Sequence, residues 1–325
     1  MNNILVSGAS GIVGYGILRA LKTYNNELNL VGTSIYDDSV AENFCDIFEK
    51  AIPTSDDSYI DWLISTIRKF NISMLIPGIE DDLYKWSEFK DEINKSGAVL
   101  LLNNIDLIDF CKDKWLFFLE LKKNNNPYLI NTTLENDFDI LVNNLGIPFL
   151  LKPRKGYASR GLVKINNRTT FDLHKDNIGK SLMAQEYVGN ENEEYTTSVF
   201  GDGRGGFFTM MTLRRKLSKD GFTDRAETFE SPIIIEAIII LCKEFKPIGP
   251  TNFQFRLHNG RLKLLEINPR ISSSTSIRTA LGYNESAMAV RYFLDNKIPV
   301  QPIVKRGKAV RFIEDKITFY DRSNF

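Results

Sequence analysis

The sequence of 325 residues has few cysteines and no net charge. The cysteines are Cys45, Cys111 and Cys242, and their wide spacing fits neither a disulfide framework nor a paired metal-binding motif. Such sparse usage is typical of a reducing compartment. Lysine plus arginine and aspartate plus glutamate each number 41, so no global electrostatic field would recruit nucleic acid or an anionic membrane. Any basic function must therefore be local.

Long apolar runs are also missing. The most apolar run, residues 233–242, contains Glu236 and is ended by Lys243, so it is too short to span a bilayer. The first residues lead straight into an expected strand rather than a signal peptide. We therefore expect a cytoplasmic protein without nucleic-acid or membrane partners. Its 43% hydrophobic content is enough for the cores of two or three soluble domains.

The N-terminal stretch from Asn3 to Gly32 reads as strand, glycine-rich turn, helix and strand. This βαβ pattern predicts a parallel sheet and the α/β class. The turn from Gly8 to Gly14 could seat a pyrophosphate on a helix N-terminus, with Asp37 near a ribose; alternatively, its glycines only let the turn close and the helix pack. The acidic loop 78–82 follows a short strand and is either a ligand-binding edge or a solvated helix start.

A helix is predicted from about Ile105 to Lys123. Lys114 lies near its apolar stripe, where the side chain either covers apolar surface with its stem or binds a phosphate. The sequence Asn124-Asn125-Asn126-Pro127 then ends the helix and marks the boundary into a small lobe.

Residues 149–163 predict a strand, a basic loop with two glycines and a second strand. The strand delivers Lys152, and the loop contains Gly156, Ser159 and Gly161. Backbone N–H groups and a hydroxyl in such a loop can bind phosphate oxygens, while the lysine supplies a compact positive charge. The loop is not a Walker loop, because no Gly-Lys-Ser or Gly-Lys-Thr follows its glycines. A plain basic hairpin is the other interpretation.

Two further segments carry polar residues near predicted strand ends. The segment Gln185-Glu186-Tyr187-Val188 ends one strand, and Glu194 begins the next. These acids could accept hydrogen bonds from ribose hydroxyls, or they are ordinary loop acids. Arg214, Arg215 and Lys216 are consecutive on an extended segment, so they cannot all point the same way and only one or two of them can reach a site.

The most informative stretch is a predicted hairpin from Gly249 to Arg270 with Asn259-Gly260 at its turn. A two-residue turn would pair Gln254 with Leu265 and separate it from Glu266. A three-residue turn, residues 258–260, would pair Asn252 with Glu266 and bring Gln254 to the same face. We predict the second register.

In that register Gln254, Glu266 and Asn268 converge, with Arg270 beside them. Amide and carboxylate oxygens are the ligands that Mg²⁺ prefers when it also holds phosphates. The alternative is an exposed polar face on an ordinary hairpin. Phosphoryl chemistry is therefore the first hypothesis for this protein.

Together these stretches resemble the ATP-grasp superfamily, in particular one synthetase half of the carbamoyl phosphate synthetase large subunit and related carboxylate-amine ligases. The Glu-x-Asn-Pro-Arg sequence at 266–270, after a strand that bears Gln254, is the most specific part of this resemblance. The resemblance implies a Rossmann-like domain at residues 1–102 and an ATP-grasp region at 103–325. That region would form two α+β lobes that enclose ATP, with a small lid lobe at about 126–184.

The resemblance also implies roles for the residues. Lys114, Lys152 and the loop with Gly156, Ser159 and Gly161 would bind the nucleotide phosphates. Residues 185–188 (Gln185, Glu186, Tyr187 and Val188) would contact adenine, and Glu194 the ribose. Gln254, Glu266 and Asn268 would hold Mg²⁺, with Mn²⁺ as an alternative. Arg270 and Lys152 would be catalytic, with Arg214 or Lys216 as a helper, and Arg278 with the serine run 272–276 would contact the substrate.

The activity implied is that of an ATP-dependent carboxylate-amine or carboxylate-thiol ligase acting through an acyl phosphate. Its partners would be a small carboxylate and an amine, and the resemblance allows a homodimer. Two alternatives stay open: a nicotinamide-dependent reductase that uses the Gly8 to Gly14 turn, and a module that binds ATP without catalysis. The absence of a Tyr-x-x-x-Lys pair counts against a short-chain reductase.

Overall fold

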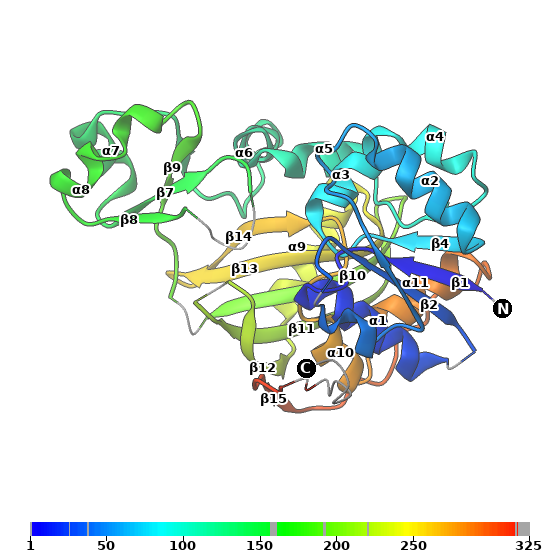
Figure 1. The fold of residues 1–325 in the computed structure, drawn as a ribbon. Helices are drawn as coiled ribbons and strands as arrows, with labels where there is room; N and C mark the ends of the chain where they lie inside the picture. The colour runs from blue at the N-terminus through cyan, green and yellow to red at the C-terminus, as the bar shows by residue number, and fades with distance from the viewer. Residues whose placement is uncertain are drawn as a thin grey trace.

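The computed structural model describes residues 2–25, 27–37, 39–156, 161–190, 193–219, 221–315 and 317. These residues form a parallel sheet, a large antiparallel sheet and a small antiparallel sheet, each with helices packed against it (Figure 1). This arrangement confirms the predicted α/β class, with a Rossmann-like sheet first and two α+β lobes after it. None of the described helices has the length and apolar character needed to cross a bilayer.

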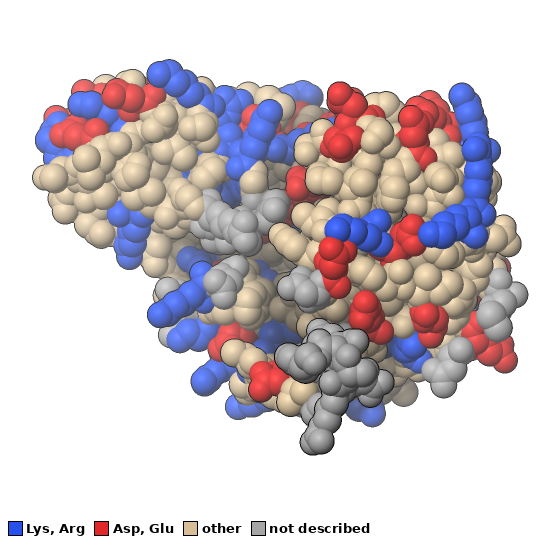
Figure 2. Space-filling view, viewed as in Figure 1, with Lys and Arg blue, Asp and Glu red and all other residues tan. Residues whose placement is uncertain are grey.

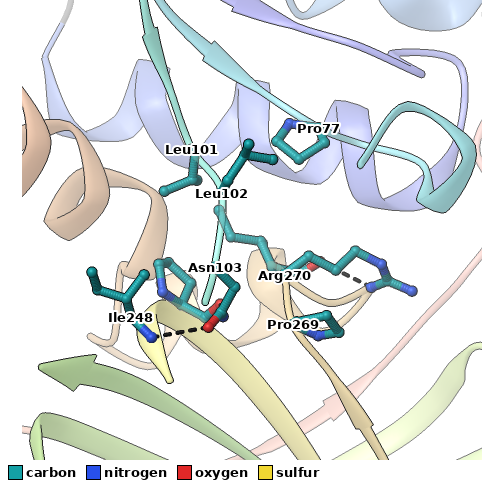
Figure 3. A pocket seen from close by; sticks show the side chains of 9 residues that line it. Pro77, Leu101, Leu102, Asn103, Ile248, Pro269 and Arg270 are labelled. Carbon is teal, nitrogen blue, oxygen red and sulfur yellow. Dashed lines mark hydrogen bonds between the residues drawn. The ribbon is translucent and has the colours of Figure 1, made fainter. Parts of the chain in front are cut away.

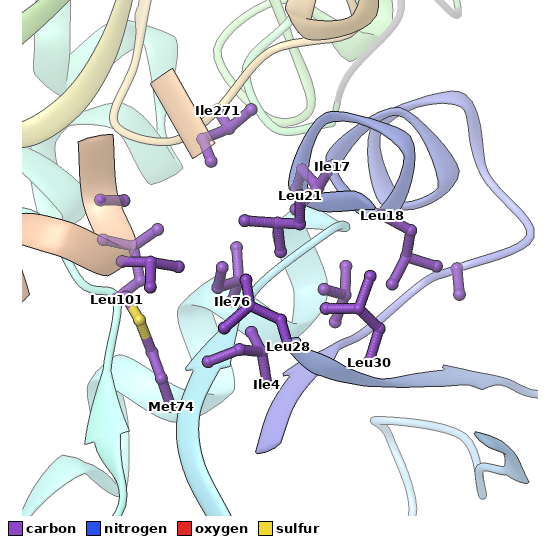
Figure 4. Packing of buried hydrophobic residues seen from close by; sticks show 14 of the residues in the cluster. Ile4, Ile17, Leu18, Leu21, Leu28, Leu30, Met74, Ile76, Leu101 and Ile271 are labelled. Atoms are coloured by element: carbon purple, nitrogen blue, oxygen red, sulfur yellow. The ribbon is translucent and has the colours of Figure 1, made fainter. Parts of the chain in front are cut away.

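The N-terminal sheet is parallel and buried on both faces. In the order β3-β2-β1-β4-β5 it contains β1 (Asn3–Val6), β2 (Asn29–Ser34), β3 (Ile47–Lys50), β4 (Ile72–Ile76) and β5 (Val99–Leu100), with helices α1 (Ile12–Tyr24), α2 (Tyr59–Lys69), α3 (Glu80–Glu88) and α4 (Lys90–Asn94). Ile4 and Val6 of β1 pack on the side of α1, whereas Leu5 packs on the side of α2 to α4, as strand alternation requires. Ile271, far away in the sequence, joins the α1 side (Figure 4). The core of this sheet therefore continues into the C-terminal part of the chain.

The glycine turn before α1 is tightly packed. A Cβ at Gly14 would lie well inside van der Waals contact with the carbonyl oxygen of Gly8, and Gly8 itself has φ +56°. Packing alone therefore accounts for these two glycines.

The large sheet separates two layers of helices. Its order is β14 (Arg261–Asn268), β13 (Ile248–His258), β10 (Glu194–Asp202), β11 (Phe207–Leu217), β12 (Thr223–Phe229) and β15 (Lys308–Val310), all antiparallel. Helix α9 (Pro232–Phe245) packs on the face that carries Tyr195, Val199, Phe253 and Phe255. Helices α10 (Thr275–Ala280) and α11 (Glu285–Phe293) contact α1. This contact joins the N-terminal part of the chain to the C-terminal part.

The β13–β14 hairpin differs from the predicted register. His258 pairs with Arg261, so the turn has two residues, Asn259 and Gly260, both with positive φ. The predicted three-residue turn is therefore wrong, and so is the pairing of Asn252 with Glu266, because Asn252 pairs with Asn268. A β-bulge leaves Leu265 of β14 without a partner between the pairs Phe255–Leu264 and Gln254–Glu266, so Gln254 pairs with Glu266. The expectation that Gln254 shares a face with Glu266 and Asn268 is confirmed.

The small lobe projects to the left in Figure 1. It contains the sheet β6-β9-β7-β8 with β6 (Thr132–Thr133), β7 (Phe149–Pro153), β8 (Val163–Ile165) and β9 (Leu182–Glu186), and helices α7 (Phe138–Leu145) and α8 (Arg168–Asp172). Single 3₁₀ turns cover Val40–Asn43 and Lys175–Asn177.

The helix predicted from about Ile105 to Lys123 is in fact two helices, α5 (Ile105–Lys112) and α6 (Lys114–Lys123). Asp113 breaks it, with extended dihedral angles, and its carboxylate accepts the N–H of Trp115 at 2.8 Å. The same carboxylate pairs with Arg154 at 2.7 Å. Asp113 therefore caps α6 and ties it to the loop after β7.

Candidate active site

A cavity of about 460 Å³ lies between the small lobe, the large sheet and the N-terminal sheet. Lys152 and Gln185 line it from the small lobe, Glu266 from the large sheet, and Gly11 and Glu80 from the N-terminal part. The surface is hollowed below the small lobe (Figure 2). The two N-terminal residues follow β1 and β4, so the carboxyl edge of the parallel sheet, where open α/β sheets bind ligands, faces this cavity.

One end of the cavity is an apolar slot. Its side chains come from α6, the segment before β6, the small sheet and β14: Phe117, Phe118, Leu121, Ile130, Leu150, Met183 and Leu264. Gln185 lies among them, and its amide donates to the Thr132 hydroxyl at 2.9 Å. An apolar slot with few placed polar groups suits an aromatic base.

The other three residues of the expected adenine segment do not form part of this cavity wall. The side chain of Val188 is buried, and the ammonium of Lys164 lies 4.1 Å from the ring centre of Tyr187. Glu186 lies 3.5 Å from a ring nitrogen of His258. Of that segment only Gln185 reaches the cavity.

Two lysines line the cavity, Lys152 on β7 and Lys114 at the start of α6. Burial lowers the pKa of Lys152 to about 8, against the favourable charge of Glu266. Its ammonium donates to the Leu265 carbonyl at 3.4 Å. Lys114, the first residue of α6, donates to the Gly156 carbonyl at 2.5 Å. The structure thus brings Lys114, Lys152 and Gly156 together.

The other two residues of the expected phosphate-binding loop are Ser159 and Gly161. Ser159 lies outside the described residues. Gly161 has φ +73° but is not in the cavity wall, whereas Leu162 beside it is.

The three expected metal ligands share one wall of the cavity. Burial alone would raise the pKa of Glu266, but Lys152, Lys114 and the Asn268 amide, which donates to its carboxylate at 3.1 Å, bring that pKa below its ordinary value. Glu266 is therefore ionised. The described residues contain no group of three His, Cys, Asp or Glu side chains able to hold a metal by themselves. One carboxylate and two amide oxygens are the donor types that suit a Mg²⁺ ion with further phosphate ligands. In this structure the Gln254 oxygen accepts from Arg215 at 2.6 Å and the Asn268 oxygen from Arg270 at 3.4 Å. Of the three side chains, only Glu266 is therefore held free of a described arginine.

The arginine of β11 that faces the cavity is Arg215, not Arg214. Arg214 is exposed and pairs with Glu227 on β12. Arg215 lines the cavity and donates to the Gln254 side-chain oxygen at 2.6 Å. The prediction that Arg214 helps in catalysis is therefore wrong, because its neighbour Arg215 is the residue that faces the cavity. Lys216 is exposed like Arg214, because both lie on the opposite face of the strand.

Glu194 is in the cavity wall but its two oxygens are occupied. Arg215 contacts one oxygen at 2.9 Å and Arg256 the other at 2.8 Å, and the Glu194 side chain is only 3% exposed. The sequence did not single out Arg256. The signal that could have found both arginines is register, because Arg215 and Arg256 are the residues that pair with Glu194 on its two neighbouring strands.

Arg270 connects the large sheet to the N-terminal part. Its guanidinium pairs with Glu80, at the start of α3, at 2.6 Å and donates to the Ile271 carbonyl at 3.0 Å. Behind it lies a small void between the two sheets, lined by Pro77, Asn103 and Ile248 among others (Figure 3). Glu80, from the acidic loop 78–82, lies in the wall of the larger, 460 Å³ cavity.

The residues of the expected substrate region differ in whether they reach the cavity. Ser272 and Ser273 line the cavity. Arg278 does not: it is fully buried, pairs with Glu285 at 3.2 Å and donates to the Ser272 hydroxyl at 2.8 Å. Arg278 thus supports the cavity wall from behind rather than contacting a ligand directly.

The small lobe and the larger antiparallel sheet, which enclose the cavity between them, form an ATP-grasp fold. Residues 179–316 match the family model described as ATP-grasp in the biosynthetic pathway with Ter operon.

Solved structures agree with the fold. The chain is similar to N5-carboxyaminoimidazole synthetase from Staphylococcus aureus complexed with ADP, with 18% identity, a TM-score of 0.70, and coverage of 93% of this chain and 80% of that one. The ATP complex of carboxyaminoimidazole ribonucleotide synthase from Aspergillus clavatus gives 16% identity, a TM-score of 0.70 and the same coverage. Pyruvate carboxylase from Rhizobium etli gives 15% identity and a TM-score of 0.68, over 91% of this chain and 28% of that one. At these identities the likeness shows the fold.

Proposed function

We propose that this chain is an ATP-dependent ligase that joins a small carboxylate to an amine, or to a thiol, through an acyl phosphate. The observation that carries the proposal is the continuity of one cavity. The apolar side chains of the slot, Lys152, Glu266, Arg270 and the edge of the N-terminal sheet all line this one cavity. A base, a triphosphate and a second substrate could therefore lie one after another.

The phosphate-binding part uses residues that the cavity brings together. Lys114 and Lys152 would bind the α and β phosphates, with Gly156 beside them. Gln254, Glu266 and Asn268 would hold Mg²⁺, which would neutralise phosphate charge when bound. Gln185 would contact the base. We assign Glu194 to holding Arg215 and Arg256 in place, since both of its oxygens are occupied.

In the proposed reaction, a carboxylate oxygen attacks the γ phosphorus while the bond from that phosphorus to the bridging oxygen of the β phosphate breaks. ADP leaves and an acyl phosphate forms. The amine nitrogen then attacks the acyl carbon, loses a proton, and inorganic phosphate leaves. Phosphoryl transfer depends mainly on positioning and charge neutralisation, which Lys152 and Arg270 would supply. Exclusion of water by the small lobe would protect the acyl phosphate.

The names of the solved relatives support a small-molecule substrate. One A. clavatus structure is described as a complex with ADP and 5-aminoimidazole ribonucleotide, a small molecule. We extend to this chain only the class, a small amine with a carboxylate partner.

The test is an ADP-release screen that pairs carboxylates with amines and thiols in the presence of Mg·ATP. Glu266→Gln should lower turnover by at least about a hundredfold, because it removes the single carboxylate from the proposed metal site. Glu92→Gln, an exposed acid on α4, is the matched control and should keep full activity. Thermal unfolding of each variant checks the fold.

Full activity of Glu266→Gln would reject the metal assignment. ATP binding without ADP release for any pair would favour the non-catalytic module. The reductase alternative predicts tight nicotinamide binding near the Gly8 to Gly14 turn. Asp37, its proposed ribose ligand, is exposed and pairs with Lys50 at 2.6 Å.

A further inference from the structure

Helix α9 is apolar on two opposite faces. One face packs on the large sheet through buried side chains: Ile234, Ala237, Ile238, Leu241 and Phe245. The other face exposes four isoleucines, Ile233, Ile235, Ile239 and Ile240, by 42–53%. Single exposed apolar residues are ordinary, but a contiguous apolar face on a surface helix marks an interaction site.

The charges on this face are placed symmetrically about its apolar centre. Ile233, Glu236, Ile240 and Lys243 recur at spacings of three and four, so they form one stripe along the helix. Glu236 and Lys243 are both exposed. They lie on opposite sides of the midpoint between Ile239 and Ile240, each about one helical turn away.

We propose that α9 binds α9 of a second copy of this chain, antiparallel, about a two-fold axis that passes between Ile239 and Ile240. In that arrangement Ile239 contacts Ile240 of the other copy, and Glu236 lies opposite Lys243 of the other copy, twice by symmetry. The surface is thus complementary to itself in apolarity and charge. A partner of a single charge sign would match only half of it.

The length of α9 sets the expected affinity of this dimer, and the position of α9 decides whether the dimer covers the active-site cavity. A helix of 14 residues is about 21 Å long, which is short for an interface, so we expect a dissociation constant in the micromolar range. No residue of α9 lines the described wall of the active-site cavity. Each copy would therefore keep its own open site.

The test is sedimentation velocity of the full chain over about 1 to 100 μM, a range chosen around the expected affinity. Ile240→Glu should give a monomer. Glu236→Lys and Lys243→Glu should each weaken the dimer about tenfold, because each replaces two attractions with two repulsions. The double variant Glu236→Lys/Lys243→Glu restores both attractions and should dimerise nearly as well as the wild type.

Ile140→Glu is the matched control, because Ile140 is a 45% exposed isoleucine on helix α7 of the small lobe. It should leave the dimer unchanged, and thermal unfolding should show that all variants fold. A monomeric wild type over the whole range would overturn the proposal. So would a dimer that persists in Ile240→Glu, or a charge-swapped double variant that stays as weak as the single variants.

Discussion

If Lys152 binds the nucleotide phosphates as proposed, its burial sets a pH window over which nucleotide binding weakens. Burial lowers the pKa of Lys152 to about 8, whereas an unburied lysine titrates near about 10.4. With a pKa of about 8, roughly 90% of Lys152 is charged at about pH 7 and roughly 10% at about pH 9. If only the ammonium binds the phosphates, the dissociation constant for ATP rises about tenfold between these pH values. Bound phosphates raise the pKa of the lysine in the complex, so the loss continues only up to that higher pKa.

Calorimetric titration of ATP without an acceptor substrate, from about pH 7.5 to 9.5, measures this effect. The phosphate second pKa of about 6 lies below the window, so the nucleotide charge is constant there. Lys152→Arg keeps its charge throughout and should give a flat profile. Lys180→Arg, an exposed position in the small lobe, should keep the wild-type slope. A flat wild-type profile, or an unchanged slope in Lys152→Arg, would refute the reasoning.

Three further changes test the site in other ways. Arg215→Met should lower the free energy of unfolding by about 2–4 kcal/mol, because it removes the buried partner of the buried Glu194 carboxylate and leaves only the half-buried Arg256. Arg214→Met should change the free energy of unfolding by less than about 0.5 kcal/mol in the same urea titration, because its ion pair with Glu227 is exposed. Gly14→Ala should cost about 1–3 kcal/mol, measured by thermal unfolding, because the new methyl group collides with a backbone carbonyl. Deletion of Leu265 should leave the protein folded but weaken ATP binding by up to about tenfold in calorimetry, because it removes the bulge whose carbonyl accepts from Lys152.

The fold could be predicted from the sequence where local patterns agree with the tertiary structure. The strand, glycine turn, helix and strand of residues 3–32 predict a parallel sheet, and β1 is buried on both faces as such a sheet requires. The break at Asp113 could not be predicted from periodicity, because the apolar residues of α5 and α6 together imitate one long stripe. There the carboxylate of Asp113 is satisfied by the Trp115 N–H and by Arg154, which lies in another part of the chain.

The site, like the fold, could be predicted where residue types within one segment indicate its chemistry, but not where the pairing of distant strands decides which residue faces the cavity. The residue types at Lys152, Glu266, Asn268 and Arg270 indicate phosphoryl chemistry, and all four line the same cavity. The choice among consecutive cations on β11 depended instead on which of them pairs with Glu194. Strand register is set by long-range pairing, so it could not be read from the segment alone.

The hairpin shows why one assumption about register failed while its consequence held. The predicted register assumes that the turn length fixes the pairing along the whole hairpin, so that Gln254 reaches Glu266 only through a three-residue turn. The Asn259-Gly260 pair satisfies the positive φ values of a two-residue turn, and the bulge at Leu265 then shifts the pairing by one residue before the site. The turn and the site are therefore independent of each other. Because the carbonyl of Leu265 also accepts from Lys152, the residue that corrects the register lies where the chain contacts the buried lysine.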